Sequence, residues 1–78
     1  MQISIEYCGT CNYRPIAAAL AMAIRQAFGI DPILVHSTRT GAFEVSADGE
    51  TISSKLASGK FPAHDAVVET LRKRRGPS

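Results

Sequence analysis

The chain has 78 residues, which is enough for one small domain (residues 1–75) and leaves no room for a second folded unit. Its 45% hydrophobic and 21% charged residues are typical of a globular protein and exclude a disordered chain. Four of the nine basic residues are consecutive at 72–75, so the preceding residues carry five basic against seven acidic side chains and lack the basic face of a nucleic-acid-binding protein.

The first third of the chain predicts a strand, a tight loop and a helix. Residues 2–7 alternate in polarity, as expected of a β-strand with one buried face. After a loop that contains both cysteines, residues 12–28 place apolar side chains at helical spacing, and a proline in the first turn is compatible with this helix. Gly29 is expected to end it.

The rest of the chain predicts three more strands and a final helix. The strands are expected at residues 33–36, 42–47 and 50–53. Asp48-Gly49 lies between the last two and favours a tight hairpin. Phe61-Pro62 is expected to begin the final helix, whose last turn carries the basic run as cations suited to a helix C-terminus. We expect residues 76–78 to be a frayed tail.

The order β-α-β-β-β-α restricts the fold. The first two strands and their helix form a right-handed parallel unit, and the hairpin can join the sheet only in antiparallel fashion. With the first strand in the centre, the prediction is an α/β (α+β), thioredoxin-like fold, a four-stranded mixed sheet with two helices. In that topology the first, second and fourth strands end on the same side, so the cysteine loop and the connections at 37–41 and 54–61 gather there.

The two cysteines form the motif Cys8-Gly-Thr-Cys11. A disulfide that closes so short a loop contributes little chain entropy, so a purely structural cross-link is not expected. Between a strand and a helix, this spacing lets the two sulfurs bond, and the helix N-terminus stabilises a thiolate. We therefore interpret Cys8 and Cys11 as the candidate catalytic residues of thiol–disulfide exchange, which requires no bound cofactor.

Three segments resemble the signature of the selenoprotein W-like (Rdx) family: residues 7–15 (YCGTCNYRP), residues 41–45 (GAFEV), and residues 54–55 (SK) followed by 59–62 (GKFP). This resemblance implies a thioredoxin-like fold and a thiol-based oxidoreductase, linked in some members to glutathione. Many members carry selenocysteine at the position of Cys11, which favours Cys11 as the attacking thiol. Comparison with thioredoxins favours Cys8, because their first cysteine is the more exposed. Unlike thioredoxins, the chain has no proline in residues 37–41.

Weaker candidates surround the cysteine pair. Thr10 lies between the two thiols, and Arg39, Lys55 and Lys60 are predicted to lie near them, where a cation favours a thiolate or binds a carboxylate of glutathione. Solvated loop cations are the simpler interpretation of all three basic residues. His36 and His64 do not have the spacing of a zinc motif, so no metal is expected, although an intermolecular site built from two cysteine pairs stays open.

The sequence thus predicts a thiol–disulfide oxidoreductase whose partner is a protein disulfide or thiol, or glutathione as a co-substrate. A non-enzymatic redox-sensing interaction module is the alternative, and metal binding through the same thiols is a more distant one. No apolar run approaches the ~20 residues that span a bilayer, and no signal peptide is visible. We therefore expect a cytoplasmic protein without a membrane or nucleic-acid partner, in which a free sheet edge is compatible with a homo-oligomer.

Overall fold

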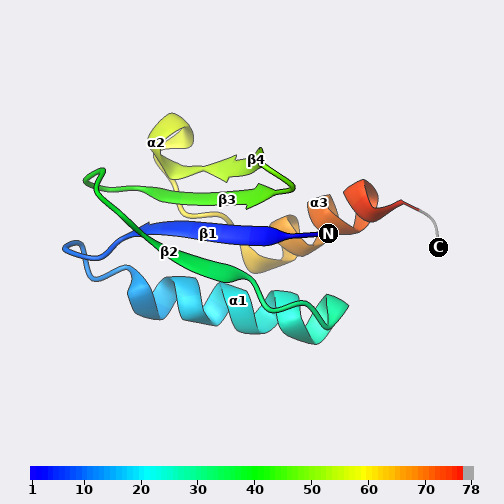
Figure 1. Ribbon diagram of the computed structural model, residues 1–78. Coiled ribbons are helices and arrows are strands. Elements are labelled where there is room, and N and C mark those ends of the chain that lie inside the picture. The colour runs from blue at the N-terminus through cyan, green and yellow to red at the C-terminus, as the bar shows by residue number, and fades with distance from the viewer. Residues whose placement is uncertain (77–78) are drawn as a thin grey trace.

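The computed structural model describes residues 1–76 and has the predicted element order with one additional short helix (Figure 1). The elements are β1 (Ile3–Cys8), α1 (Arg14–Phe28), β2 (Ile33–Ser37), β3 (Phe43–Ala47), β4 (Glu50–Ser54), α2 (Lys55–Ser58) and α3 (His64–Arg75). Of the predicted frayed tail at 76–78, Gly76 is the C-cap of α3, and residues 77–78 lie outside the described residues.

The described residues form a four-stranded mixed sheet in the order β2-β1-β3-β4. β1 is parallel to β2 and antiparallel to β3, and β3 is antiparallel to β4. β1, β2 and β4 therefore end on the same side, and Figure 1 shows the cysteine loop, the β2–β3 connection and α2 gathered there. The predicted central position of the first strand is confirmed. We refer to this side of the molecule as the cysteine end.

The core lies between one face of the sheet and the helices α1 and α3. Alternate residues of β1 and β3 face the helices, which contribute buried side chains at helical spacing. The fully or almost fully buried residues of this cluster are Ile3, Ile5, Tyr7, Ala17, Leu20, Ile24, Phe43, Val45, Ala47, Val67 and Leu71. The opposite face of β1 and β3 carries half-buried polar side chains such as Ser4 and Ser46. Ile33 and Val35 of β2 lie on the same face, because they pair with Ser4 and Glu6 and neighbouring strands share the pleat.

Both long helices begin later than the sequence indicates. Asn12 has a φ of 61° in the left-handed region, so it ends the cysteine turn, and α1 starts at Arg14. Ala63 is extended (φ −71°, ψ 140°), which moves the start of α3 from the predicted Phe61-Pro62 to His64. The predicted end of α1 is confirmed, because Gly29 caps it with a φ of 69°. Within residues 1–76, no helix combines the length and the apolar character needed to cross a membrane.

The short helix α2 occupies a segment that the sequence suggests is a loop. The Ser54 hydroxyl accepts a hydrogen bond from the Ala57 N–H (3.1 Å), as at an N-cap. The buried Glu44 carboxylate accepts one from the Lys55 N–H (2.8 Å) and a longer one from the Leu56 N–H (3.4 Å). A carboxylate ten residues upstream of the N-cap therefore fixes the start of α2.

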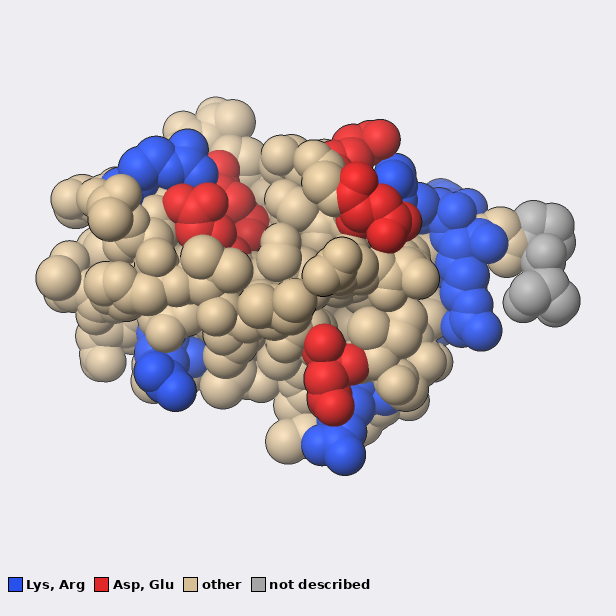
Figure 2. Space-filling view, viewed as in Figure 1, with Lys and Arg blue, Asp and Glu red and all other residues tan. Residues whose placement is uncertain are grey.

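The basic run at 72–75 forms the last turn of α3, as predicted. Arg74 pairs with two acidic side chains of the β3–β4 hairpin, Glu50 (3.2 Å) and Asp48 (3.9 Å). Figure 2 shows basic and acidic side chains side by side near the end of α3. The cations thus complement the helix dipole and are partly neutralised by the hairpin.

Candidate functional site

Cys8 and Cys11 are joined by a disulfide in the structure. Their Cα atoms are 5.3 Å apart, within the usual range for a disulfide. Cys8 is the last residue of the central strand β1, and Cys11 lies in the turn before α1. The loop between strand and helix thus brings the two candidate catalytic residues into covalent contact at the cysteine end.

The two sulfur-bearing residues differ in exposure. Cys8 is only 2% exposed, because it is paired with Ser37 of β2 and its N–H donates to the Ala42 carbonyl (2.8 Å). Cys11 is partly exposed. The expectation from thioredoxins, that the first cysteine is the more accessible, is therefore wrong for this chain. The central strand extends through Cys8 and buries it.

Each sulfur has one polar neighbour. The Gly41 N–H donates to Cys11 Sγ at 3.3 Å, and Cys8 Sγ lies 3.4 Å from the Thr10 hydroxyl. Gly41 has a φ of 81°, a conformation that glycine adopts without strain. A proline at this position would have no backbone N–H. Because the connection between β2 and β3 contains no proline, the Gly41 N–H is available as a donor to the sulfur. Thr10 is exposed, as its predicted place between the thiols requires.

The imidazole of His36 lies directly over Gly9 of the cysteine loop. A Cβ added to Gly9 would overlap the His36 ring where it stands, so any side chain at this position requires the exposed imidazole to move. The parallel register pairs His36 with Tyr7, and their rings meet edge to face at a centroid distance of 5.9 Å. β2 therefore presents its histidine to the loop that follows Tyr7.

A hollow of about 440 Å³ opens beside the disulfide. It is lined by Tyr7, Gly9, Thr10, Asn12, Arg14 and His36. The walls therefore come from the end of β1, the cysteine loop, the start of α1 and β2. The Arg14 guanidinium is the one cation in this lining and is suited to an anionic group.

The predicted cation Arg39 is bound by another residue. Its guanidinium makes hydrogen bonds of 3.0 to 3.2 Å with the Glu6 carboxylate, which also accepts from the Ser37 hydroxyl. The Ser37 hydrogen bond and the Arg39 guanidinium together lower the pKa of Glu6 below its usual value of 4.5, although partial burial raises it. Arg39 therefore serves an ion pair on the sheet face, so it is not simply the solvated loop cation of the alternative interpretation.

Lys60 lies in the exposed loop after α2, where its N–H donates to the Ser58 hydroxyl at 3.2 Å. The cation closer to the cysteine turn is Lys55, whose Nζ lies 5.5 Å from the Tyr13 ring and 5.1 Å from the Phe61 ring. Phe61 also meets Tyr13 and Phe43 edge to face, with centroids 4.8 and 5.2 Å away. This aromatic cluster fixes the loop after α2 against the first turn of α1.

The histidines show why part of this site could not be predicted from the sequence. His64 is exposed at the start of α3, while His36 contacts the cysteine loop through a strand register that no local motif reveals. The Gly41 N–H is equally invisible, because any residue except proline carries one. Within the described residues, no group of three or more His, Cys, Asp or Glu side chains is placed to hold a metal ion.

Comparisons with known proteins cover nearly the whole chain. A family model described as the Rdx family matches residues 2–73. Two curated proteins, Migration and invasion enhancer 1 of Bos taurus and that of Mus musculus, are each 32% identical over 73 residues, or 94% of this chain. The chain spans 64% of the length of each of these relatives.

Two solved structures have the same fold. A selenoprotein W-related protein from Vibrio cholerae matches with a TM-score of 0.82 at 27% identity, over 92% of both chains. A protein from Bordetella parapertussis matches with a TM-score of 0.83 at 24% identity, over 94% of this chain and 95% of that one. The first likeness extends to sequence, and the second supports the fold alone. The predicted thioredoxin-like architecture is confirmed.

Proposed function

This chain belongs to the Rdx family, and from that membership we propose that it is a thiol–disulfide oxidoreductase that cycles Cys8 and Cys11 between disulfide and dithiol. The observation that carries the proposal is the bonded cysteine pair at the cysteine end, with one sulfur partly exposed beside a backbone N–H donor. Its partner is a protein disulfide or glutathione, and its proposed location is the cytoplasm, where thiols are kept reduced.

In the first step, the Cys11 thiolate of the reduced protein attacks one sulfur of a partner disulfide. A bond forms between Cys11 and that sulfur, the partner S–S bond breaks, and the released sulfur leaves as a thiolate that takes a proton from water. Two features support Cys11 in this role: it is more accessible than Cys8, and the Gly41 N–H points at its sulfur. A donor there stabilises the thiolate before attack and again when it leaves.

In the second step, Cys8 loses its proton and attacks Cys11 Sγ, which releases the partner as a second thiolate. The Cys8–Cys11 disulfide forms, and two electrons have passed from the protein to its partner. Two glutathione thiols, or one protein dithiol, return the disulfide to the dithiol by the reverse sequence. Burial of Cys8 suits this internal step, because its sulfur is reached by Cys11 far more readily than by a bulky partner.

The alternative is a redox sensor that binds a partner in only one oxidation state. The hydrogen bond from Gly41 favours this candidate, because it couples the state of Cys11 to the connection between β2 and β3. An oxidoreductase must turn over a disulfide substrate, whereas a sensor need only change its affinity. Catalytic reduction of a small disulfide by glutathione therefore separates the two.

The first test is a redox titration in glutathione buffers, with thiols trapped and counted by mass. We expect the wild type to form a reversible internal disulfide and Cys8→Ser to accumulate a glutathione adduct on Cys11. Cys11→Ser is the matched variant and is expected to accumulate much less adduct on the buried Cys8. If both wild-type thiols stay reduced across the cytosolic range of potentials, the proposed exchange is wrong.

A further inference from the structure

β2 is an edge strand without the usual protection. In the described residues it pairs with β1 on one side, and its other side faces solvent. Ile33 is 50% and Val35 42% exposed. The strand carries no lysine, proline or carboxylate between Ile33 and Ser37, although such residues commonly prevent edges from pairing. Its peptide groups and side chains are therefore available to another strand.

The opposite edge of the sheet is built differently. β4 has the sequence Glu50-Thr-Ile-Ser-Ser54, and its pairing with β3 is interrupted by an irregularity next to Val45/Ser46. Bulges and polar side chains of this kind discourage strand addition. The two edges of one sheet thus differ, and the β2 edge is the one suited to binding.

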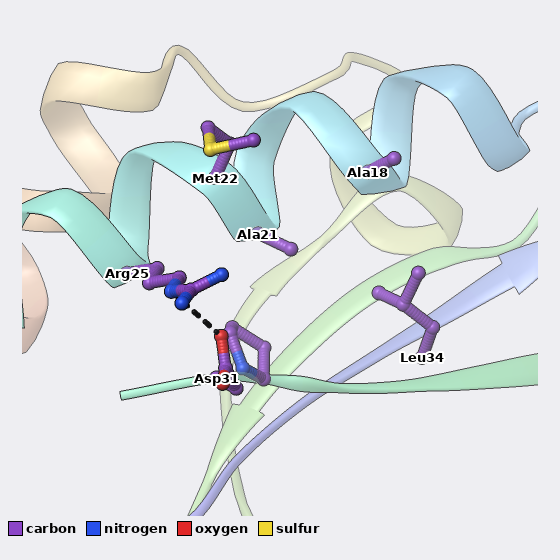
Figure 3. A pocket seen from close by; sticks show the side chains of 7 residues that line it. Ala18, Ala21, Met22, Arg25, Asp31 and Leu34 are labelled. Atoms are coloured by element: carbon purple, nitrogen blue, oxygen red, sulfur yellow. Dashed lines mark ion pairs between the residues drawn. The ribbon is translucent and has the colours of Figure 1, made fainter. Parts of the chain in front are cut away.

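An apolar groove of about 210 Å³ continues the β2 edge onto α1 (Figure 3). Ala18 and Ala21 of the helix and Leu34 of the strand line it, and Met22 at its rim points away from the strand and is 55% exposed. Small alanine side chains permit a close approach of another backbone. An exposed ion pair between Arg25 and Asp31 (3.3 Å) closes one end. Leu34 faces this groove on the α1 side, whereas Ile33 and Val35 lie on the other face of the sheet. The exposed strip is therefore the edge strand itself, with the groove along one side.

We propose that this strip binds a second copy of the chain, through antiparallel pairing of the two β2 strands about a two-fold axis at Val35. Two four-stranded sheets then join into one of eight strands. In this register Val35 lies opposite itself and Ile33 lies opposite Ser37 of the second copy. An isologous contact of this kind needs a self-complementary surface, which the strand provides.

The charges beside β2 select this register. Two residues beyond the Ile33–Ser37 pair, it brings Asp31 of one copy toward Arg39 of the other. Each already has a partner in its own chain, Arg25 and Glu6 respectively, but both side chains are more than half exposed. A two-fold axis at His36 would instead set Ile33 opposite the Arg39 guanidinium. An axis at Leu34 would leave Asp31 opposite Ser37, without a cation. Opposite charges meet at both ends of the Val35-centred pairing, which favours a second copy over an unrelated strand.

The proposal is tested by sedimentation of the 78-residue protein over a wide concentration range. We expect the wild type to change from 8.4 kDa to twice that mass as its concentration rises. Val35→Lys places two cations face to face at the axis and is expected to weaken dimerisation about tenfold or more. Thr51→Lys on the β4 edge is the matched control and is expected to behave as the wild type. Far-ultraviolet circular dichroism verifies that both variants are folded.

A cysteine placed on the axis tests the register itself. In a background with Cys8 and Cys11 changed to serine, Val35→Cys is expected to form a disulfide-linked dimer on mild oxidation, because the two positions face each other. Ile33→Cys is expected not to, since position 33 faces position 37. Equal cross-linking of both variants overturns the register. A wild-type mass that stays at 8.4 kDa overturns the dimer and assigns the edge to a different protein.

Discussion

At the residue scale, the contact between His36 and Gly9 shows how tightly the cysteine loop is packed. The imidazole fills the space that any side chain at position 9 would need. The backbone of Gly9 is outside the left-handed region, so a side chain at this position is limited by the neighbouring ring and not by the torsion angles of Gly9. The loop that carries both sulfurs is therefore supported by a residue 27 positions later in the chain.

We predict that Gly9→Ala destabilises the oxidised protein by about 1 kcal/mol or less, because the methyl group displaces the end of an exposed side chain. His36→Ala should restore most of this loss when combined with it, although alone it removes only the ring contacts. Urea unfolding of the four proteins in this double-mutant cycle measures the coupling. Additive effects of the two substitutions would show that the overlap is relieved elsewhere.

Some residues of this site can be recognised from the neighbouring sequence positions, and others cannot. The cysteine motif and Thr10 lie within four consecutive positions and are visible in the sequence. The roles of Gly41 and His36 depend on which residues of β2 and of the β2–β3 connection face the loop, and that requires a strand register. Arg39 was predicted to lie near the sulfurs, yet its stronger attraction is to Glu6 across the parallel pair.

At the element scale, α2 depends on a side chain from another element. The Glu44 carboxylate accepts hydrogen bonds from the Ser54 hydroxyl and from the N–H groups of Lys55 and Leu56, although Glu44 is only 8% exposed. Negative charge at a helix N-terminus is favourable, and here the charge also satisfies otherwise unpaired donors. A four-residue helix has no apolar periodicity, which explains why sequence patterns suggest a loop.

We predict that Glu44→Gln lowers the free energy of unfolding by roughly 1–3 kcal/mol, because a buried charged acceptor is replaced by a neutral group that also carries an N–H donor. Glu50→Gln on the neighbouring strand is the control, since that side chain is 68% exposed and its loss should change stability by about 0.5 kcal/mol or less. Chemical denaturation at neutral pH measures both. Equal small effects would show that α2 holds its place without this carboxylate.

The strands and α1 were predictable because each has a strong local pattern. Alternation in residues 3–7, helical spacing up to Gly29 and the Asp48-Gly49 turn are features of consecutive residues. The starts of α1 and α3 were placed too early for a different reason. Asn12 takes a left-handed conformation to complete the cysteine turn, and Ala63 stays extended, and neither choice is encoded in the hydrophobic period.

At the scale of the whole molecule, the topology follows from rules of connection. A right-handed crossover and a hairpin leave few arrangements of four strands, so the order β2-β1-β3-β4 could be derived from the sequence. Pairing beyond the chain could not be derived this way. It depends on exposed fractions along β2 and on a groove to α1, both of which require coordinates.

Global stability should fall in acid partly through Glu6. The lowered pKa of Glu6 means that its ion pair contributes fully above about pH 4.5 and that the contribution disappears as pH falls through the lowered value. The Glu6 side chain is 32% and Arg39 56% exposed, so the expected size is about 0.2–1 kcal/mol. Urea unfolding of the wild type and Glu6→Gln at pH 7 and pH 3 measures it. A stability difference between the two proteins that is the same at both pH values would contradict the assignment.

The cysteine pair and the basic last turn of α3 lie at different ends of the molecule. α1 starts at the cysteine end, whereas α3 starts beside the middle of the sheet, and its basic last turn lies at the end of the molecule opposite the cysteine loop (Figure 1). A negatively charged surface that binds the basic turn would leave the disulfide uncovered, because the disulfide lies at the other end of the molecule. The protein can therefore be held in place by one end while it exchanges electrons at the other, without either event blocking the other.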